Sequence, residues 1–284
     1  MDSKMKEYIY SKYKETFRGI SRFSITWLEN FVDFLINHNV NEEQTKEIIQ
    51  KLLSPENLEN MAKSDFNIAP FIYNERDFFS YLASIEDELT PEYCEQAYDY
   101  ILKHASEGNV IDSFIKYLVI TRFDDIQVKS DVAKLKENPD GEYMICCCLG
   151  DFKICRVSVS IDNANANNIF FDELHTRRNL TGAKVGSVLF QTLFSEIHEH
   201  FPNNDLVTRR VRKRNVGGQR FYERMGGTFF DVSTGDVISP SEVDTSAIGN
   251  IGVYYDKEDL LELSQREITR PTLEDKVNKR KNTK

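Results

Sequence analysis

The stretch that decides the fold runs from Ile169 to Ser187 and reads IFFDELHTRRNLTGAKVGS. It begins with an apolar run typical of a strand and ends in a loop with two glycines. Apolar residues from Val185 to His200 then recur on one face of a helix. The first turn of a helix leaves backbone N–H groups unpaired, and the helix dipole adds positive charge there. We therefore expect an anion-binding loop between a strand and a long helix.

The same stretch has a simpler interpretation as an ordinary turn between a strand and a helix. In that case Gly182 only supplies a positive φ, which glycine adopts without steric cost. The pattern of strand, glycine loop and helix is too common to separate the two interpretations by itself.

A second motif runs from Asn215 to Gly227 and reads NVGGQRFYERMGG. It follows a strand predicted from Leu206 to Val211. Its central part, Val216 to Arg224, predicts a short helix that stops at the pair of glycines. The two motifs thus follow each other along the chain with one strand between them.

Together the motifs resemble those of the GNAT superfamily of acyl-CoA-dependent N-acetyltransferases. The first family motif is roughly Leu-x-Val, four residues, and Arg/Gln-Gly-x-Gly-Ile/Val-Gly at the start of a long helix. Gly182, Val185 and Gly186 fall in its register. Thr181 replaces the usual Arg or Gln, and Lys184 replaces the middle Gly, which adds a charge and restricts the backbone.

The second motif is the more specific match. The family pattern is Asn-x-x-Ala-x-x-Phe-Tyr-Glu-Lys-Leu-Gly, and Asn215, Phe221, Tyr222 and Glu223 agree with it, while Gly218 replaces Ala. The resemblance covers residues 115 to 265 and does not extend to residues 1 to 108. It implies transfer of an acetyl group from acetyl-CoA, the co-substrate, directly to a primary amine, without a metal.

The resemblance also implies which residues bind the cofactor. The loop N–H groups would hold the CoA pyrophosphate, while a strand edge and an asparagine would contact the pantetheine arm. The residues are Leu174, His175, Thr176, Thr181, Gly182, Ala183, Lys184, Val185, Gly186, Ser187 and Asn215.

Two catalytic roles follow from the resemblance. Tyr222 would protonate the departing thiolate, because charge develops on sulfur as the amine attacks; its alternative role is packing on the sheet. Asp172 and Glu173 are candidates for the base that takes the amine proton. Only one of them can face the substrate, because side chains alternate along a strand. His175 is a third candidate, and solvent-facing carboxylates are the alternative for both acids.

A basic run interrupts an otherwise acidic chain, whose formal net charge is -10. It either attracts CoA phosphates or an acidic partner, or it is a solvated strand and loop. Its residues are Arg209, Arg210, Arg212, Lys213 and Arg214, with Arg177 and Arg178 expected nearby.

The remaining pattern predicts an α+β fold, with helices flanking a GNAT-like mixed, mostly antiparallel sheet. An all-helical N-terminal domain (1–108) precedes the acetyltransferase domain (109–265), and a polar, disordered tail (266–284) follows it. The expected elements are a strand at 114–123, a helix at 128–136, a hairpin of 143–149 with 152–161, a strand at 169–176 and a final pair of 228–232 with 251–255.

Composition narrows the class of protein further. The chain has 284 residues, 40% of them hydrophobic, and no apolar run approaches the roughly 18 residues that span a bilayer. The negative balance argues against nucleic acid and mildly favours a cationic acceptor. We expect a cytoplasmic protein that acts on an amine-bearing small molecule or protein, and the sequence leaves open whether two copies pair.

The five cysteines include three in a row, Cys146 to Cys148. Because adjacent strand residues point to opposite faces, the three thiols cannot bind one metal ion without distortion. We interpret them as small apolar strand residues in a reducing compartment, with Cys155 across the hairpin.

The rival to an enzyme is a GNAT-like binding or regulatory module that has lost catalysis, as the departures at Thr181 and Lys184 would suggest. The helical part would then serve for interaction.

Overall fold

The structure is a computed structural model of the whole chain. It describes residues 4, 7, 11, 22–38, 41–57, 59, 75–104, 110–172, 174–176 and 180–273. The predicted disordered tail beyond residue 273, and part of the predicted N-terminal domain, lie outside the described residues.

One sheet organises the C-terminal part, with the strand order β1-β2-β3-β4-β6-β9-β7-β8, and β5 pairs with β3 beside β4. All described strand pairs are antiparallel except β4 with β6, which is parallel. The strands are β1 (Ile126–Ser130), β2 (Tyr143–Leu149), β3 (Phe152–Ile161), β4 (Asn168–Phe171), β5 (His175–Thr176), β6 (Asp205–Arg212), β7 (Thr228–Asp231), β8 (Val237–Ile238) and β9 (Asn250–Tyr255). The expected mixed, mostly antiparallel sheet is confirmed.

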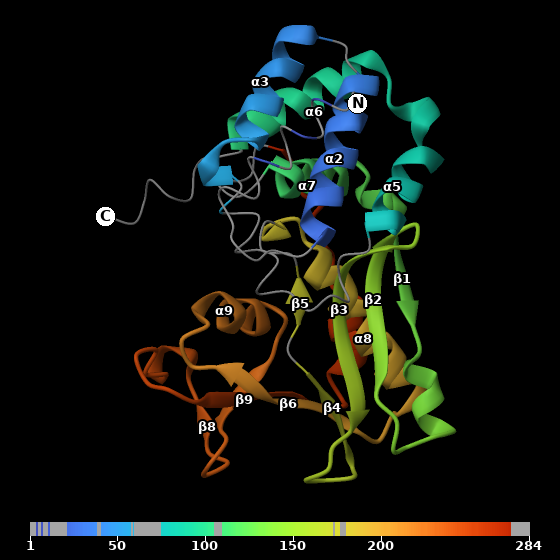
Figure 1. Cartoon of the computed structure of the whole chain (residues 1–284). Helices are drawn as coiled ribbons and strands as arrows, with labels where there is room; N and C mark the ends of the chain where they lie inside the picture. Colours follow the sequence, from blue (N-terminus) through green and yellow to red (C-terminus); the bar gives the residue numbers. More distant parts are fainter. Residues whose placement is uncertain are drawn as a thin grey trace.

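Helices flank this sheet, as Figure 1 shows. The long helix α8 packs against β2 and β3, and α10 lies against α8. Several short 3₁₀ helices (η) connect the larger elements. The helical elements of the C-terminal part are η3 (Phe123–Asp125), η4 (Val132–Lys136), α8 (Val185–His200), α9 (Val216–Arg224), η6 (Pro240–Glu242) and α10 (Leu260–Ser264).

The N-terminal part is helical, as predicted. Two of its helices have defined starts: the Asn41 side chain accepts hydrogen bonds from the N–H groups of Glu43 and Gln44, and Pro91 opens a helix behind Thr90. The described elements are α2 (Arg22–Asn37), α3 (Glu42–Leu52), α5 (Glu75–Ser84), η1 (Glu86–Glu88), α6 (Pro91–His104) and α7 (Val110–Thr121).

The strand predicted at 114–123 is wrong, because these residues belong mainly to α7. Every residue from Val110 to Ile120 is buried, Asp112 and Lys116 included. A helix enclosed on all sides needs no polar stripe, so its sequence loses the 3.6-residue period and resembles a buried strand. The apolar β-branched residues of this segment then favour the prediction of a strand.

Two smaller predictions also need correction. The helix predicted at 128–136 is the strand β1 followed by the 3₁₀ helix η4. The single strand predicted at 169–176 is interrupted between β4 and β5. The hairpin of β2 and β3, the helices α8 and α9, and the pairing of β7 with β9 agree with prediction.

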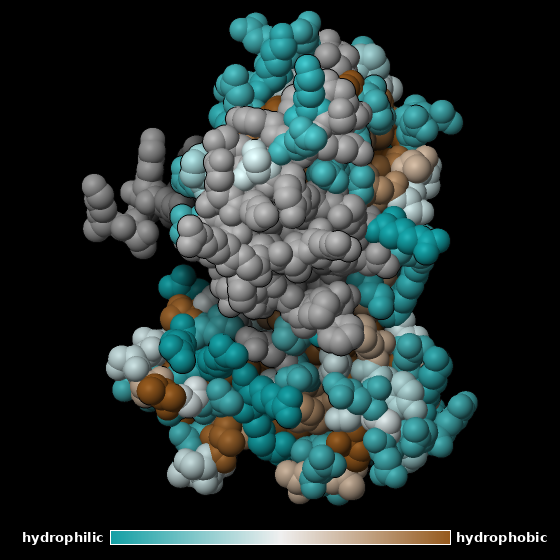
Figure 2. All heavy atoms as spheres, in the orientation of Figure 1, coloured by the Kyte–Doolittle hydropathy of each residue, from teal (hydrophilic) through white to brown (hydrophobic). Residues whose placement is uncertain are grey.

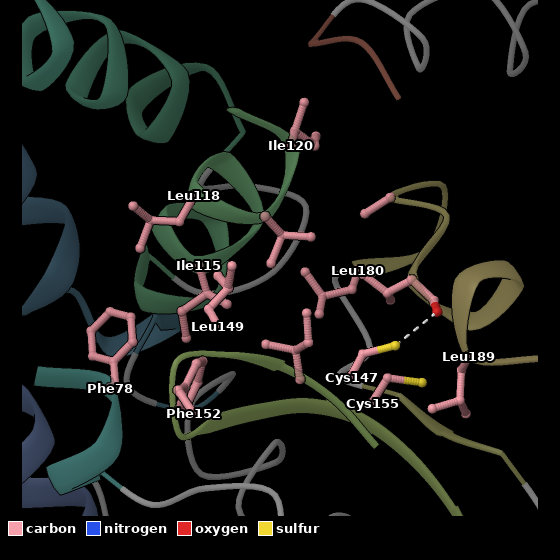
Figure 3. Close-up of a cluster of buried hydrophobic side chains, with 14 of the residues drawn as sticks. Phe78, Ile115, Leu118, Ile120, Cys147, Leu149, Phe152, Cys155, Leu180 and Leu189 are labelled. Atoms are coloured by element: carbon pink, nitrogen blue, oxygen red, sulfur yellow. Dashed lines mark hydrogen bonds between the residues drawn. The ribbon is translucent and has the colours of Figure 1, made fainter. Parts of the chain in front are cut away.

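The helical part and the sheet share one hydrophobic core, which runs from Leu28 to Leu263. The Phe78 ring on α5 lies 5.1 Å from the Phe152 ring at the hairpin turn and 6.3 Å from Phe114 on α7. Figure 3 shows Phe78 and Phe152 side by side beneath α7. These contacts fix the helices over the turn of the β2–β3 hairpin.

No helix in the described part of the chain is both long and apolar enough to cross a membrane. On the face drawn in Figure 2, the described surface is mainly hydrophilic, with hydrophobic side chains scattered over it. Val237 and Ile248 are among the exposed large hydrophobic residues.

We expect Phe78→Ala to lower the free energy of unfolding by about 3 to 5 kcal/mol, because it opens a cavity where the two parts meet. Chemical denaturation followed by circular dichroism should still give one transition, since the core is continuous. Phe79→Ala is the matched control: this neighbouring ring is only partly buried, so its loss should be clearly smaller. Equal losses, or two separate transitions, would contradict the shared core.

Candidate active site

The candidate site lies where two parallel strands separate. β4 and β6 pair only at Asn168, Ile169 and Phe170. Beyond Phe170 the chain leaves β6, and β5 pairs with β3 instead, with Thr176 opposite Cys155. β6 meanwhile continues along β9. The structure describes no strand on the second edge of β5, so backbone N–H and C=O groups there are available to an extended ligand.

The predicted phosphate loop lies at the start of α8, next to this opening. A turn closes it, in which the Ala183 N–H donates to the Leu180 carbonyl at 2.9 Å. The Ser187 N–H is also paired, with the carbonyl of Lys184. Within the described chain the N–H groups of Val185 and Gly186 have no backbone partner. Two unpaired donors at the positive end of a 16-residue helix fit an anion.

Two residues of this loop have left-handed backbone conformations. Gly182 has φ +89° and Lys184 has φ +62° with ψ 0°. Lys184 is the only described residue other than glycine with a positive φ. A side chain in this conformation costs roughly 1–2 kcal/mol. The structure thus explains why the family motif has glycine at this position, and why Lys184 strains the loop.

Gly186 has a different role from Gly182. A Cβ atom at position 186 would lie 3.0 Å from a methyl carbon of Leu174 and 3.3 Å from the Phe221 ring. The absence of a side chain therefore lets the start of α8 pack closely against α9 and the segment before β5. Two of the predicted site segments are held together by this contact.

Tyr222 reaches the point where the strands separate. Its hydroxyl oxygen accepts a hydrogen bond from the Leu174 N–H at 3.4 Å, although the side chain is 2% exposed. The Tyr222 ring lies 5.7 Å from Phe190 of α8 and 5.9 Å from Phe171 of β4. Its predicted proton-donor role and its alternative packing role are therefore not exclusive, because packing positions the hydroxyl.

Tyr255 is a residue that the sequence did not single out. It lies behind Tyr222, with its ring 4.8 Å from Phe194. A Cβ on Gly227 would come within 3.2 Å of the Tyr255 Cζ atom, so this glycine of the second motif makes room for the phenol. Burial raises the pKa of Tyr255 well above its ordinary value, and its hydroxyl has no partner within the described structure.

Asn215 caps α9 rather than projecting freely. Its side-chain oxygen accepts a hydrogen bond from the Gly218 N–H at 3.0 Å. A Cβ at position 218 would lie 2.6 Å from the Asn215 amide nitrogen, which accounts for glycine where the family has alanine. Its predicted contact with the pantetheine arm stays a prediction.

The candidate bases are only partly visible. Glu173 lies outside the described residues, as do Arg177 and Arg178. Asp172 follows β4 directly, and its carboxylate accepts a hydrogen bond from Arg210 at 2.9 Å. His175 is exposed, and its place in the ladder is opposite Arg156 of β3. Asp172 is thus the candidate that the structure describes directly after β4, and the Arg210 guanidinium lies beside it.

The predicted basic run divides into structural and exposed residues. Arg209 donates two hydrogen bonds to the buried carboxylate of Asp162, at 2.8 and 2.9 Å. Arg210 lies over the Phe170 ring and pairs with Asp172. Arg212 and Arg214 are exposed. Only part of the run is therefore available to a phosphate or an acidic partner.

Two cysteines support the site from behind, as Figure 3 shows for Cys147 and Cys155. The Cys147 thiol donates to the Val185 carbonyl at 3.5 Å, and Cys155 lies 3.3 Å from the Thr176 hydroxyl. One contact holds the start of α8 and the other holds β5. Within the described residues there is no cluster of three or more His, Cys, Asp or Glu that could hold a metal ion.

Comparison with known proteins finds a likeness only among solved structures. No protein-family model and no curated protein matches the chain. A crystal structure of an N-acetyltransferase from Staphylococcus aureus Mu50 is 12% identical, covers 47% of this chain and 98% of its own, and has a TM-score of 0.32. An acetyltransferase of the GNAT family from the same organism is 14% identical, covers 58% and 93%, and has a TM-score of 0.31.

Likenesses this weak say nothing about activity or acceptor. The element order does agree with the motifs: the first motif opens α8, the second occupies α9, and β6 lies between them. The C-terminal part therefore has the GNAT-like fold that the two motifs predict.

We expect Tyr255→Phe to raise the free energy of unfolding by about 1 kcal/mol, because it removes a buried hydroxyl that has no partner. Denaturation curves of the two proteins in the absence of ligand measure the difference. Tyr254→Phe, at a partly buried position on the same strand, should change little. A clear loss of stability in Tyr255→Phe would show that the hydroxyl does have a partner in the folded protein.

Proposed function

We propose that the chain is an N-acetyltransferase that moves an acetyl group from acetyl-CoA directly to a primary amine. One observation supports this most: the Tyr222 hydroxyl and the Leu174 N–H meet at the separation of β4 and β6. A buried hydroxyl and a backbone donor at the end of an open strand edge suit a thioester. The hydroxyl can give a proton to the sulfur of the thioester, and the N–H can donate a hydrogen bond to its carbonyl oxygen.

The neighbouring elements fit the rest of the cofactor. The unpaired N–H groups of Val185 and Gly186 would bind the pyrophosphate, assisted by the dipole of α8. Gly182 leaves the loop backbone accessible. The free edge of β5 would pair with the amides of the pantetheine arm as an added strand does.

In the reaction, the acceptor nitrogen forms a bond to the carbonyl carbon, and the bond from that carbon to sulfur breaks. Acetyl-CoA supplies the activated acyl group. Leu174 would stabilise the charge that develops on the carbonyl oxygen, and Tyr222 would give its proton to the sulfur. Asp172 or Glu173 would take the proton that the amine must lose, and no covalent enzyme intermediate is needed.

The acceptor is proposed as an amine-bearing small molecule or protein, with cationic character favoured by the net charge of -10. Neither nucleic acid nor a membrane is part of the proposal. The five cysteines are all unpaired, in keeping with a reducing cytoplasmic setting.

A second candidate is a GNAT-like module that binds without catalysis. The left-handed backbone of Lys184 favours it, because the residue places a side chain where the family has none. In this alternative the strained loop does not hold acetyl-CoA and the helical part serves for interaction. The two candidates therefore differ first in whether acetyl-CoA binds.

We expect acetyl-CoA to raise the thermal unfolding midpoint. At a ligand concentration one hundred times Kd, one-site binding adds about 2.7 kcal/mol to the free energy of unfolding. Differential scanning fluorimetry over a concentration series measures the shift. Absence of any shift at millimolar acetyl-CoA would overturn the proposed function.

Two variants at one position serve as controls for this measurement. Lys184→Ala and Lys184→Gly both remove the ammonium group, but only glycine removes the Cβ atom from a left-handed backbone. Lys184→Gly should therefore bind acetyl-CoA more tightly than Lys184→Ala. It should also be more stable by about 1 kcal/mol without ligand. Equal behaviour of the two would show that the strain at Lys184 does not limit the loop.

Tyr222→Phe should lower turnover by about a hundredfold while leaving acetyl-CoA affinity nearly unchanged, because it removes a proton donor and keeps the ring. Release of the CoA thiol in the presence of a panel of primary amines measures turnover, and calorimetry measures affinity. Tyr143→Phe is the control and should retain full activity, because the Tyr143 hydroxyl on β2 donates to the Asn138 carbonyl and not to a residue of the site. Unaltered turnover in Tyr222→Phe would remove this residue as the acid.

A further inference from the structure

The outer face of β2 carries a pair of thiols that the proposed acetyl transfer does not use. Cys146 and Cys148 lie two residues apart, and their sulfur atoms are 3.7 Å from each other. Cys147 between them points toward the core and α8, as Figure 3 shows. Because side chains alternate along a strand, the other two share the opposite face. Cys146 is 5% exposed and Cys148 is buried completely.

Cations border this pair on both neighbouring strands. Lys129 of β1 lies opposite Cys146 in the ladder, and Lys153 of β3 lies opposite Cys148. Both lysines are exposed, and Lys129 also donates a hydrogen bond to the Asp151 carboxylate at 2.7 Å. Arg156 is the second ladder partner of Cys146. Positive groups of this kind favour a thiolate over a thiol.

The two sulfurs differ in their affinity for the proton. A hydrogen bond from Cys148, assisted by Lys153 and Lys129, lowers the pKa of Cys146 below its ordinary value. The same hydrogen bond and burial raise the pKa of Cys148. Cys146 therefore has more thiolate character than an ordinary cysteine and has the Cys148 thiol beside it, which is the combination of an attacking and a resolving cysteine.

The backbone allows the two sulfurs to join. Residues two apart in a strand are separated by roughly 6.6 Å, near the upper end of the Cα separations that disulfides span. The ladder of β2 with β3 is irregular between Cys147 and Cys148. The extra residue, Ile154, lies on β3, and the 3.7 Å separation of the two sulfur atoms shows that the side chains of Cys146 and Cys148 already turn toward each other.

We propose that Cys146 and Cys148 form a peroxide-sensitive dithiol, which closes to a disulfide when it is oxidised. The Cys146 thiolate attacks one oxygen of hydrogen peroxide, giving a sulfenic acid and releasing hydroxide. The Cys148 sulfur then attacks the Cys146 sulfur, a disulfide bond forms, and the departing hydroxyl leaves as water with the Cys148 proton. Hydrogen peroxide is the oxidant, and its two oxygen atoms leave as hydroxide and water.

The cross-strand pair of Cys147 and Cys155 is a poor competitor. Their thiols are engaged with Val185 and Thr176, and both are completely buried. Burial raises the pKa of Cys155 to about 12 and that of Cys147 well above its ordinary value. A neutral buried thiol attacks peroxide far more slowly than a thiolate.

The test uses the full-length protein with stoichiometric hydrogen peroxide at neutral pH, followed by intact-mass spectrometry under denaturing, non-reducing conditions. We expect a product lighter by two hydrogen atoms, which a dithiol reductant converts back. Loss of free thiol should be at least about tenfold slower in Cys146→Ser, because the low-pKa thiolate is missing. In Cys148→Ser, dimedone should trap a sulfenic acid at Cys146.

The remaining cysteines provide matched controls. Cys94→Ser changes a buried single thiol on α6 and should still form the disulfide, and so should Cys147→Ser. Circular dichroism of each variant confirms that it is folded before oxidation. Disulfide formation that persists in Cys146→Ser, or disappears in Cys147→Ser, would overturn the assignment. So would a native protein whose mass peroxide leaves unchanged. None of these outcomes depends on whether acetyl-CoA binds.

Discussion

The short parallel pairing of β4 with β6 is the constraint on which the site depends. It lasts for three residue pairs, and every other described strand pair is antiparallel. Beyond Phe170, β6 continues to pair with β9, whereas β5, which follows β4 in the chain, pairs with β3. The pairing of β4 with β6 therefore ends there. Within the described residues, the separation leaves one edge of β5 without a partner strand next to the start of α8. Each feature of the proposed chemistry uses that opening.

Aromatic packing keeps the opening in shape. Phe190 of α8 lies within about 6 Å of the ring of Phe171 on β4 and of the rings of Phe221 and Tyr222 on α9. Such a cluster holds α8, α9 and β4 at fixed distances. It also places the Tyr222 hydroxyl oxygen 3.4 Å from the Leu174 nitrogen. Stability and positioning are thus supplied by the same contacts.

The sequence predicted best where a pattern is local. The hairpin of β2 and β3, and the helices α8 and α9, carry their periodicity and their turn residues within a few positions. The helix α7 was missed because burial on all sides removes its polar stripe. Tyr255 could not be found either, since its place beside Tyr222 results from the pairing of β9 with β6 and β7. Long-range contacts of this kind leave no local trace.

The run of cysteines shows how a period of two divides neighbouring residues between different roles. Cys147 faces α8 and holds the Val185 carbonyl, so it belongs to the support of the loop. Cys146 and Cys148 face the other way, among exposed lysines, where a sulfur can carry charge. The side of the sheet separates Cys147 from the other two, and the hydrogen bond between Cys146 and Cys148 shifts the pKa values of those two in opposite directions. The inner thiol is held against the Val185 carbonyl, whereas the two outer thiols lie against each other with lysines on the neighbouring strands, and this contact is what lets them react as a pair.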